Sequence, residues 1–509
     1  GYEQSTTHEE LTVTNPVKES DLPKHLKDSA LSVAQQAGAT VAQFRLARHD
    51  SRGISTRDGN VENVASDTST ALSVRVVHKG AWGFAASTDL SPEASADAAK
   101  RALEMAKLSA QVSLNPVELL DEPSCGVVSW QLPIGIDAMG KSDADVIDLL
   151  QDWNSRVAGH EAVHHVDAHV GMGRDTTFFA DLNNNEISQT RDRISAQLTA
   201  INVSESGFED MRTCAPPAGR GWEYLQGTGW DWDSELAQLP EWLAEKAKAP
   251  SVEAGTWDLV IDPTNLWLTI HESVGHATEL DRALGYEANY AGTSFATIDK
   301  LGSFKYGSPL MHITGDRTAA HGLSTVGYDD EGVAAQQWDL VKEGILSGYQ
   351  TDRSTAARIG LARSNGCAFA DSALHVPIQR MPNVSLQPGT SDATTADLIA
   401  GVKKGIYIVG DKSWSIDMQR YNFQFTGQRF FEIRDGQIVG QLRDVVYQSK
   451  TPDFWGSLAA LGGQSTYLLG GALKCGKGQP GQVAPVSHGC PSALFTNINV
   501  LNGRAEASA

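Results

Sequence analysis

The sequence predicts an α+β fold whose last half is rich in β-strands. Three observations support this prediction: alternating apolar stretches, amphipathic helical stretches between them in the first half, and glycine and aspartate turns that divide the second half into short β segments. We expect an N-terminal α+β module, a mixed α/β middle module and a β-rich C-terminal domain around one helix. A length of 509 residues suits about three domains.

The first folded module is expected at residues 21–112, after a polar and flexible stretch at residues 1–20. An amphipathic helix at residues 21–37, closed by Gly38, opens the module, and a helix that begins at Ser91 and Pro92 closes it. Between them we expect a strand from Val41 and two further strands, with turns at Asp58-Gly59 and Lys79-Gly80. We interpret this module as scaffold.

The middle module is expected at residues 113–250, and a connection rich in proline and polar residues around residues 113–124 marks its start. Its first helix, near residues 142–157, has Ser142 at the N-cap and Asp145 in the capping-box position. The other expected elements are strands at about 163–180 and 186–203, joined by three asparagines, and a helix at about 234–248.

Four histidines lie close together in the middle module: His160, His164, His165 and His169. On a helix, pairs four residues apart could bind a metal. The apolar and glycine-rich surroundings favour a strand, which points neighbouring side chains to opposite faces. We therefore interpret them as solvated strand histidines.

The C-terminal domain is expected at residues 251–509. It begins with an apolar strand at Leu259, Val260 and Ile261, and a helix follows, with Asp262 at the N-cap and Pro263 at the first helical position. Many short β segments come after this helix. The domain is therefore expected to be β-rich around one buried helix.

Composition limits the partners and the compartment. The chain has 41 Lys plus Arg against 62 Asp plus Glu, a net charge of −21, which argues against nucleic acid and anionic membrane as partners. Five widely spread cysteines argue against a disulfide framework. The first residues lack the features of a signal peptide. These observations favour the cytoplasm.

The helix after Asp262 carries a His-Glu pair and a second histidine: His271, Glu272 and His276. Zinc peptidases commonly use H-E-x-x-H, which places both imidazoles on one helical face. Here the spacing is five, so on a regular helix the two rings diverge by about 140°. A shared metal would require a π-type bulge or an early unwinding, and Gly275 would permit either. The alternative is a core helix whose histidines flank a buried glutamate.

This helix resembles the active-site helix of the TldD/PmbA family of metallopeptidases, with His271, Glu272 and His276 followed by Glu279 and Asp281. Other stretches are similar to that family's blocks and occur in the same order, at residues 56–60, 80–85, 327–333, 380–383, 405–407 and 475–477. The resemblance covers roughly residues 30 to 500. It implies a zinc-dependent peptidase that acts on peptides or unfolded segments.

A zinc site needs at least one ligand besides His271 and His276. We select Cys475, because its glycine-rich setting allows close backbone approach and because Lys474 and Lys477 would favour a thiolate. The resemblance indicates the same residue, since a late cysteine completes the metal site in the family. Cys490 is the rival within the sequence.

Three further roles are expected near the metal. Glu272 would take a proton from the attacking water and pass it to the leaving amine. Glu279, three residues after His276, would orient that imidazole, or it is simply a carboxylate on the helix surface. His488 would stabilise an oxyanion or lie behind the ligands, or it is a structural loop histidine.

Two other functions compete with a peptidase. Gly135, Gly140, Lys141 and Ser142 satisfy the phosphate-loop pattern G-x-x-x-x-G-K-[ST] and precede a predicted helix, as in an NTPase. Against this, Asp137 would place a negative charge in the phosphate cradle. The second competitor is a non-catalytic partner subunit, which the presence of both histidines and the glutamate disfavours.

The resemblance also implies partners. It suggests an extended peptide substrate lying beside a sheet edge, where main-chain hydrogen bonds give low sequence specificity. It further suggests a dimer, either a homodimer or a heterodimer with a metal-free paralogue.

Overall fold

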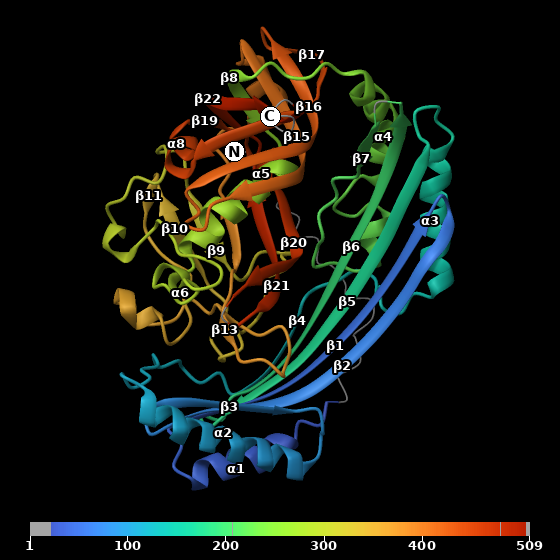
Figure 1. The fold of residues 1–509 in the computed structure, drawn as a ribbon. Helices are drawn as coiled ribbons and strands as arrows, with labels where there is room; N and C mark the ends of the chain where they lie inside the picture. The colour runs from blue at the N-terminus through green and yellow to red at the C-terminus, as the bar shows by residue number, and fades with distance from the viewer. Residues whose placement is uncertain (1–21, 206, 479, 505–509) are drawn as a thin grey trace, which may run out of the picture.

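A long, curved sheet from the first half of the chain lies along one side of a β-rich second half (Figure 1). The computed structural model describes residues 22–205, 207–478 and 480–504. The prediction for residues 1–20 lies outside this range. Within it, the α+β class and the β-rich C-terminal half are confirmed.

The curved sheet has the strand order β3-β2-β1-β5-β6-β4, with β7 paired to β6. Neighbouring strands are antiparallel except β4 and β6, which run parallel. The strands are β1 (Val41–Arg57), β2 (Asn60–His78), β3 (Ala81–Ser87), β4 (Val127–Gln131), β5 (His165–Asp181), β6 (Glu186–Ser204) and β7 (Gly207–Arg212). The turns predicted at Asp58-Gly59 and Lys79-Gly80 are confirmed, and all four residues have positive φ.

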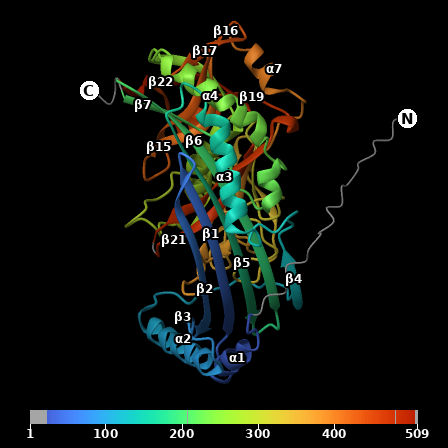
Figure 2. The ribbon, with the colours of Figure 1, turned by 90° about the vertical axis from the view of Figure 1, so that its right-hand side faces the viewer.

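Four helices accompany this sheet: α1 (Leu26–Gln36), α2 (Pro92–Val112), α3 (Asp143–Ala158) and α4 (Trp232–Lys248). The first two pack on each other and on the β3 end of the sheet, and α3 lies across the outer face of the long strands (Figure 2). The predicted capping box of Ser142 and Asp145 is confirmed. The first helix was expected from residue 21, but it begins at Leu26.

The histidines of the middle module lie in or beside β5, as predicted. Val166, Ala168 and Val170 are buried against α3 and α4, and strand alternation puts His165 and His169 on the opposite face. His165 Nδ1 lies 2.9 Å from an Asp58 carboxylate oxygen. Among the described residues, none of the four joins a group that could hold a metal.

The second half contains one large mixed sheet, a smaller sheet and two strand pairs. The large sheet has the order β15-β8-β22-β18-β16-β17, with β19 paired to β22, and the smaller one has the order β11-β10-β9-β14. The strands of the large sheet are β8 (Gly255–Ile261), β15 (Lys404–Ile416), β16 (Asn422–Arg434), β17 (Gln437–Leu442), β18 (Val445–Lys450), β19 (Leu458–Leu461) and β22 (Ala493–Asn502). Those of the smaller sheet and the pairs are β9 (Ile313–Asp316), β10 (Gln337–Lys342), β11 (Ile345–Leu346), β14 (Asn383–Leu386), β12 (Ala368–Phe369) with β13 (Ile378–Gln379), and β20 (Leu468–Lys477) with β21 (Gln482–Cys490).

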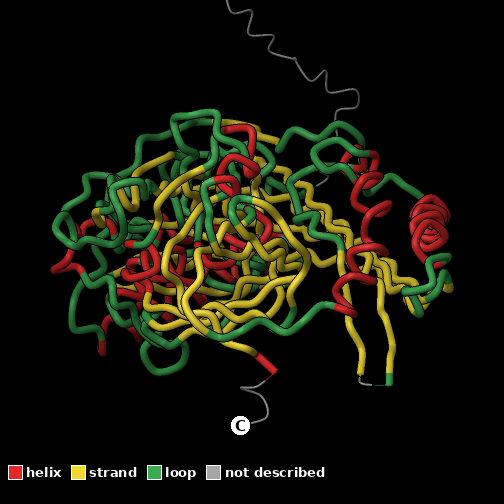
Figure 3. Tube along the Cα trace, turned by 90° about the horizontal axis from the view of Figure 1, so that it is seen from above, coloured by secondary structure: helices red, strands yellow, loops and turns green. Residues whose placement is uncertain are grey.

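Helices of the second half are short and are surrounded by strands and loops when viewed from above (Figure 3). They are α5 (Pro263–Ile270), α6 (Leu280–Ala283), α7 (Thr395–Ala400) and α8 (Thr451–Gly456). The first of them follows β8 directly and is buried along its whole length in the largest hydrophobic cluster of the molecule. Of the helices described, none is both long and apolar enough to span a membrane.

Buried ion pairs join the curved sheet to the second half. Arg45 on β1 pairs with Asp330 at 3.0 Å, and Arg75 on β2 pairs with Glu331 at 2.8 Å. The domain boundaries near residues 112 and 250 stay predictions. The strands on both sides of the first boundary share one sheet, whereas their helices cover two separate hydrophobic clusters.

Candidate metal centre

The segment that carries His271, Glu272 and His276 starts as a regular helix. The Asp262 side chain accepts a hydrogen bond from Thr264 N at 3.0 Å, and Pro263 occupies the first helical position, as predicted. Every residue of α5 is buried, because the helix runs straight from β8 into the core. The histidines that follow α5 therefore lie in the interior of the domain.

Directly after α5 the helix widens into a π-type turn, His271–Gly275, and then tightens into a 3₁₀ turn, His276–Thr278. The His276 N–H donates to the His271 carbonyl, a bond that spans five residues. A residue five positions on therefore lies above the first, and the two imidazole centroids are 4.7 Å apart. The predicted distortion of the helix is confirmed.

Side chains from other segments satisfy the carbonyls that this distortion frees. Tyr306 Oη donates to the Ser273 carbonyl at 2.5 Å, and Gln350 Nε2 donates to the Gly275 carbonyl at 2.5 Å. Gly275 permits a close approach here, because a Cβ at this position would lie 2.7 Å from Met381 Sδ. The turn is thus held by its surroundings.

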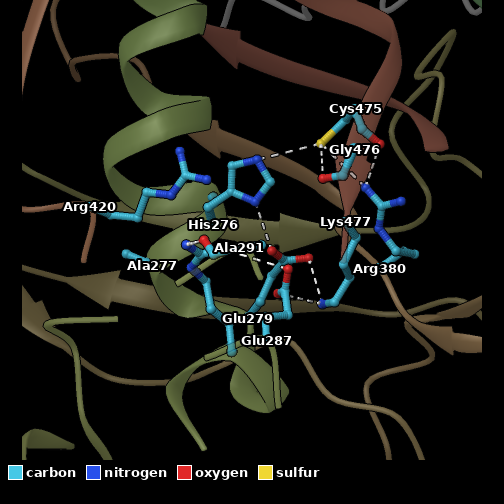
Figure 4. Close-up of polar contacts among 12 residues, drawn as sticks. His276, Ala277, Glu279, Glu287, Ala291, Arg380, Arg420, Cys475, Gly476 and Lys477 are labelled. Atoms are coloured by element: carbon cyan, nitrogen blue, oxygen red, sulfur yellow. Dashed lines mark hydrogen bonds and ion pairs between the residues drawn. The ribbon is translucent and has the colours of Figure 1, made fainter. Parts of the chain in front are cut away.

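The fold brings His271, His276 and Cys475 together from distant parts of the sequence. One ligand atom of each lies within 4.8 Å of the others, and all three residues are buried. Cys475 Sγ is 3.5 Å from His276 Nε2 (Figure 4). A register shift in β20 between Ala472 and Cys475 sets the strand face on which the cysteine lies. Their assignment as metal ligands stays a prediction.

Hydrogen bonds fix which nitrogen of His271 is free. His488 Nδ1 lies 2.8 Å from the Val384 carbonyl and must donate to it, so the neutral His488 ring has a bare Nε2. That Nε2 is 2.8 Å from His271 Nδ1, which therefore donates to it. The lone pair of His271 Nε2 remains for a metal. Both nitrogens of His488 have protein partners, which favours a positioning role over the oxyanion role.

His276 is oriented by a carboxylate. Its Nδ1 donates to Glu279 Oε2 at 2.8 Å, which leaves the Nε2 lone pair directed toward Cys475. Glu279 is held in turn by the Lys477 ammonium, 3.1 Å from its Oε1 (Figure 4). Lys477 also contacts Asp281 at 2.7 Å. Burial opposes ionisation of Glu279, but Lys477 and His276 lower its pKa overall. Glu279 is thus a buried partner of His276 rather than a surface carboxylate.

Burial keeps the imidazoles in the form that binds metals. It lowers the pKa of His276 to about 3 and that of His488 to about 4, and it places the pKa of His271 well below its usual value. All three rings are therefore neutral near pH 7. Neutral imidazole is the ligand form, so the donor set fits a divalent cation.

The surroundings of Cys475 differ in part from the prediction. Burial raises the pKa of its thiol to about 12, and the nearest cation is Arg380, whose Nη2 is 3.3 Å from Sγ. Lys477 contacts carboxylates instead, so the expectation that it favours the thiolate is wrong. A divalent cation bound to the two imidazoles would supply the charge that favours a thiolate. Cys490 is buried, and its Sγ donates to the Pro263 carbonyl at 3.7 Å.

A cavity of about 490 Å³ opens beside these side chains. Glu272 lines it together with the two histidines and Cys475, and its carboxylate forms an ion pair with Arg420. Burial raises the pKa of Glu272 although Arg420 opposes the rise. Arg420 and Arg380 were missed as site residues, because neither lies at a motif spacing from the histidines.

Backbone N–H groups of the loop that matches the phosphate pattern donate hydrogen bonds to carboxylates of the protein. Asp137 accepts hydrogen bonds from Met139 N at 2.9 Å and Gly140 N at 3.3 Å, and Glu223 accepts one from Ile136 N at 2.8 Å. Lys141 lies over the Trp222 ring, 5.5 Å from its centre. The amides that would cradle a phosphate are thus already occupied, and an NTPase is not favoured.

Comparisons with known proteins agree with this site. A PmbA/TldA metallopeptidase C-terminal domain matches residues 254–502, and a PmbA/TldA metallopeptidase domain 1 matches residues 42–106. A metalloprotease of Methanothermobacter thermautotrophicus is 28% identical, over 90% of this chain and 95% of its own. A protein of Saccharolobus solfataricus named a zinc metalloprotease TldD homolog is 28% identical, over 43% of this chain and 47% of its own.

Solved structures share the fold. A putative modulator of a DNA gyrase from Thermotoga maritima has a TM-score of 0.73 at 15% identity and covers 94% of this chain and 100% of its own. TldE from Thermococcus kodakarensis has a TM-score of 0.72 at 14% identity and covers 93% of this chain and 99% of its own. The class that fold, site and relatives define is a metallopeptidase, a hydrolase of peptide bonds. The chain belongs to the PmbA/TldD family of metallopeptidases.

Proposed function

We propose that this protein is a zinc-dependent peptidase in which His271, His276 and Cys475 hold the metal and Glu272 is the general base. The observation that carries the proposal is the tautomer of each imidazole: both Nδ1 atoms donate to buried partners, so both Nε2 atoms are free to bind. Two imidazoles and one thiolate are a donor set that suits Zn²⁺.

When bound at these side chains, Zn²⁺ would polarise a peptide carbonyl and lower the pKa of a water molecule. The chain's own residues supply the rest. Glu272, in the same cavity, accepts the proton of the attacking water and returns it to the leaving amine. Burial raises the pKa of Glu272 above that of a free glutamate, which makes its carboxylate a stronger base.

The cavity wall suits an extended peptide. Strand β20 pairs only with β21 among the described residues, and residues along β20, from Leu468 to Gly476, line the cavity. A peptide lying along this open edge would bind through main-chain hydrogen bonds, with little demand on its sequence. Peptides and locally unfolded segments are therefore the proposed substrates.

The test combines metal analysis with a single variant. The purified protein should contain zinc and cleave an unstructured peptide, and a chelator should abolish cleavage. Glu272→Gln should retain zinc but lose hydrolysis by several orders of magnitude, because the general base is gone while the ligands remain. Glu62→Gln, at an exposed glutamate of β2, is the matched control and should cleave normally. Near-normal turnover by Glu272→Gln would exclude this mechanism.

We also infer a dimer in the cytoplasm. Support for a partner comes from two kinds of similar protein: relatives named TldD homologs, and TldE, which shares the fold. Two distinct members of one family could form a heterodimer. Support for the compartment comes from the cysteines, all five of which are free. Light scattering on the protein alone, and then with a metal-free paralogue from the same cell, would distinguish a homodimer from a heterodimer.

A further inference from the structure

The loop between β15 and β16 is built to hold one side chain in the cavity. The Asp417 carboxylate accepts hydrogen bonds from the backbone N–H groups of Gln419, Tyr421 and Asn422 at 2.8–3.1 Å. Thr451 Oγ1 donates to the Arg420 carbonyl at 2.7 Å. The loop is therefore fixed from within and from α8.

Arg420, at the tip of this loop, has an unusual backbone conformation. Its φ is +66°, in the left-handed region that side chains with a Cβ rarely adopt. Such conformations cost energy and persist where the surrounding structure enforces them, often at functional sites. Here the conformation directs a guanidinium into the cavity, beside His276 (Figure 4).

Within the described part of the chain, the Arg420 guanidinium has one hydrogen-bond partner. Its Nη1 forms the ion pair with Glu272 Oε2. Its Nε is buried and has no hydrogen-bond partner among the described residues. A buried N–H without an acceptor is costly, and a fixed fork of donors suits an oxygen that carries negative charge. Arg420 also lines the cavity, so an oxygen that enters the cavity can accept a hydrogen bond from its guanidinium.

We propose that Arg420 is a catalytic residue that binds the carbonyl oxygen of the scissile peptide bond and stabilises the negative charge that develops on it. The inference rests on the proposed function, because it places the scissile bond between the ligand cluster and Glu272. It explains why an arginine occupies a position whose backbone conformation favours glycine.

Hydrolysis at this site has two steps. The water oxygen forms a bond to the carbonyl carbon, the π electrons of C=O move to the oxygen beside Arg420, and the water proton passes to Glu272. The C–N bond then breaks, the C=O bond re-forms, and the Glu272 proton passes to the leaving nitrogen. Peptide and water become a carboxylic acid and an amine, and Arg420 remains protonated throughout.

The alternative is that Arg420 only pairs with Glu272 and keeps it in place. The two roles predict different effects in a background without the base. If Arg420 only holds Glu272, Arg420→Gly lowers the kcat of the parent but not the residual kcat of Glu272→Gln, whereas loss of a donor to the oxyanion lowers both. Such a donor should also be replaceable in part by a free guanidinium ion that enters the vacated space.

Arg420→Gly is the informative variant, because glycine adopts a φ of +66° without strain and the fold should be kept. We expect unchanged zinc content, an intact fold whose Tm falls because the buried Glu272 loses its ion-pair partner, and a kcat lower by about 10²–10³-fold, the range for removing one oxyanion donor. Guanidinium chloride at low, non-denaturing concentration should restore part of the activity. Arg420→Lys should lie between the two, since an ammonium lacks the fork geometry.

Glu343→Gly is the matched control, because Glu343 is exposed, has a φ of +50°, and lies in the β10–β11 turn outside the cavity. Its kcat should equal that of the parent. A kcat within about threefold of the parent for Arg420→Gly, or a loss of kcat that guanidinium does not restore, would overturn the inference. Failure of the proposed function is a different result: a parent without chelator-sensitive cleavage, or an active Glu272→Gln.

Discussion

At the scale of single residues, each donor of the candidate centre has its own buried partner. His271 donates to His488, His276 donates to Glu279, and the Arg380 guanidinium lies against Cys475. Such partners fix the tautomer and direction of a ligand before a metal arrives. The cysteine differs from the histidines, because burial disfavours its charged form. Formation of the Cys475 thiolate would therefore depend on a bound metal cation.

Cys475 should therefore be required for tight zinc binding. Cys475→Ala removes a strong anionic ligand and, with it, the link through the metal between β20 and the histidines that follow α5. Zinc content, activity and thermal stability should therefore fall together. Metal analysis and a melting curve, each with and without added zinc, measure this. Cys490→Ala is the control: its thiol contacts the Pro263 carbonyl in the core, so it should lose some stability and keep its zinc. Zinc loss confined to the Cys490 variant would assign the ligand to the rival cysteine.

At the scale of elements, the π-type turn aligns two histidines that are five residues apart. A Cβ on Gly275 would lie 2.7 Å from Met381 Sδ and 3.6 Å from His488 Cε1. Met381 is 1% exposed and has little space into which to move. The turn, the β20–β21 hairpin and β14 are thus packed closely enough that one methyl group matters.

Gly275→Ala should destabilise the protein by about 1–3 kcal/mol, the usual cost of an added methyl group in a packed core. It should also weaken zinc binding, because Gly275 lies in the π-type turn that aligns His271 with His276, and room for the methyl group requires this turn or Met381 to shift. Denaturant unfolding of the zinc-free protein and chelator competition of the loaded one measure the two effects. In a Met381→Ala background, where the contact is gone, Gly275→Ala should cost less stability than it does in the parent. An equal cost in both backgrounds would show that the contact is not the cause.

Local patterns predicted much of this arrangement. Turn residues with positive φ marked the ends of the long strands, and the spacing of His271 and His276 required the distortion that the structure shows. Contacts between segments far apart in the sequence could not be predicted from local patterns. The surroundings of Arg420 depend on a loop 148 residues from Glu272. The side chains next to Cys475 likewise depend on strand register, which no local spacing encodes.

At the scale of the whole molecule, buried ion pairs help to hold the curved sheet against the β-rich half. The Arg75 side chain is 9% exposed and that of Glu331 is 1% exposed. Arg75 also stacks on Trp82, 3.6 Å from the ring centre, and Glu331 accepts a hydrogen bond from Arg353 N at 3.0 Å. The pair thus joins β2 to two segments of the second half.

Breaking this pair on one side should be more damaging than removing it from both. Arg75→Leu leaves Glu331 buried without its cation and should cost about 3–5 kcal/mol. Arg75→Leu with Glu331→Gln should be more stable than Arg75→Leu alone, because an amide oxygen still accepts from Arg353 N and carries no charge. Denaturant unfolding gives the two free energies of unfolding. Hydrogen exchange should show the new opening in β2 and in residues 328–333.

The pH dependence of the Arg75→Leu variant gives an independent check. Burial already raises the pKa of Glu331, and loss of the arginine that opposes the rise should raise it further. The folded variant then holds this proton to a higher pH than the unfolded chain, whose glutamate has a pKa of about 4.3. A carboxyl group whose pKa is higher in the folded state makes the protein less stable as pH rises. The difference in the free energy of unfolding between the variant and the parent should therefore shrink as pH falls from 8 toward 5. A deficit constant over that range would mean that the loss comes from the vacated Trp82 stack rather than from the stranded carboxylate.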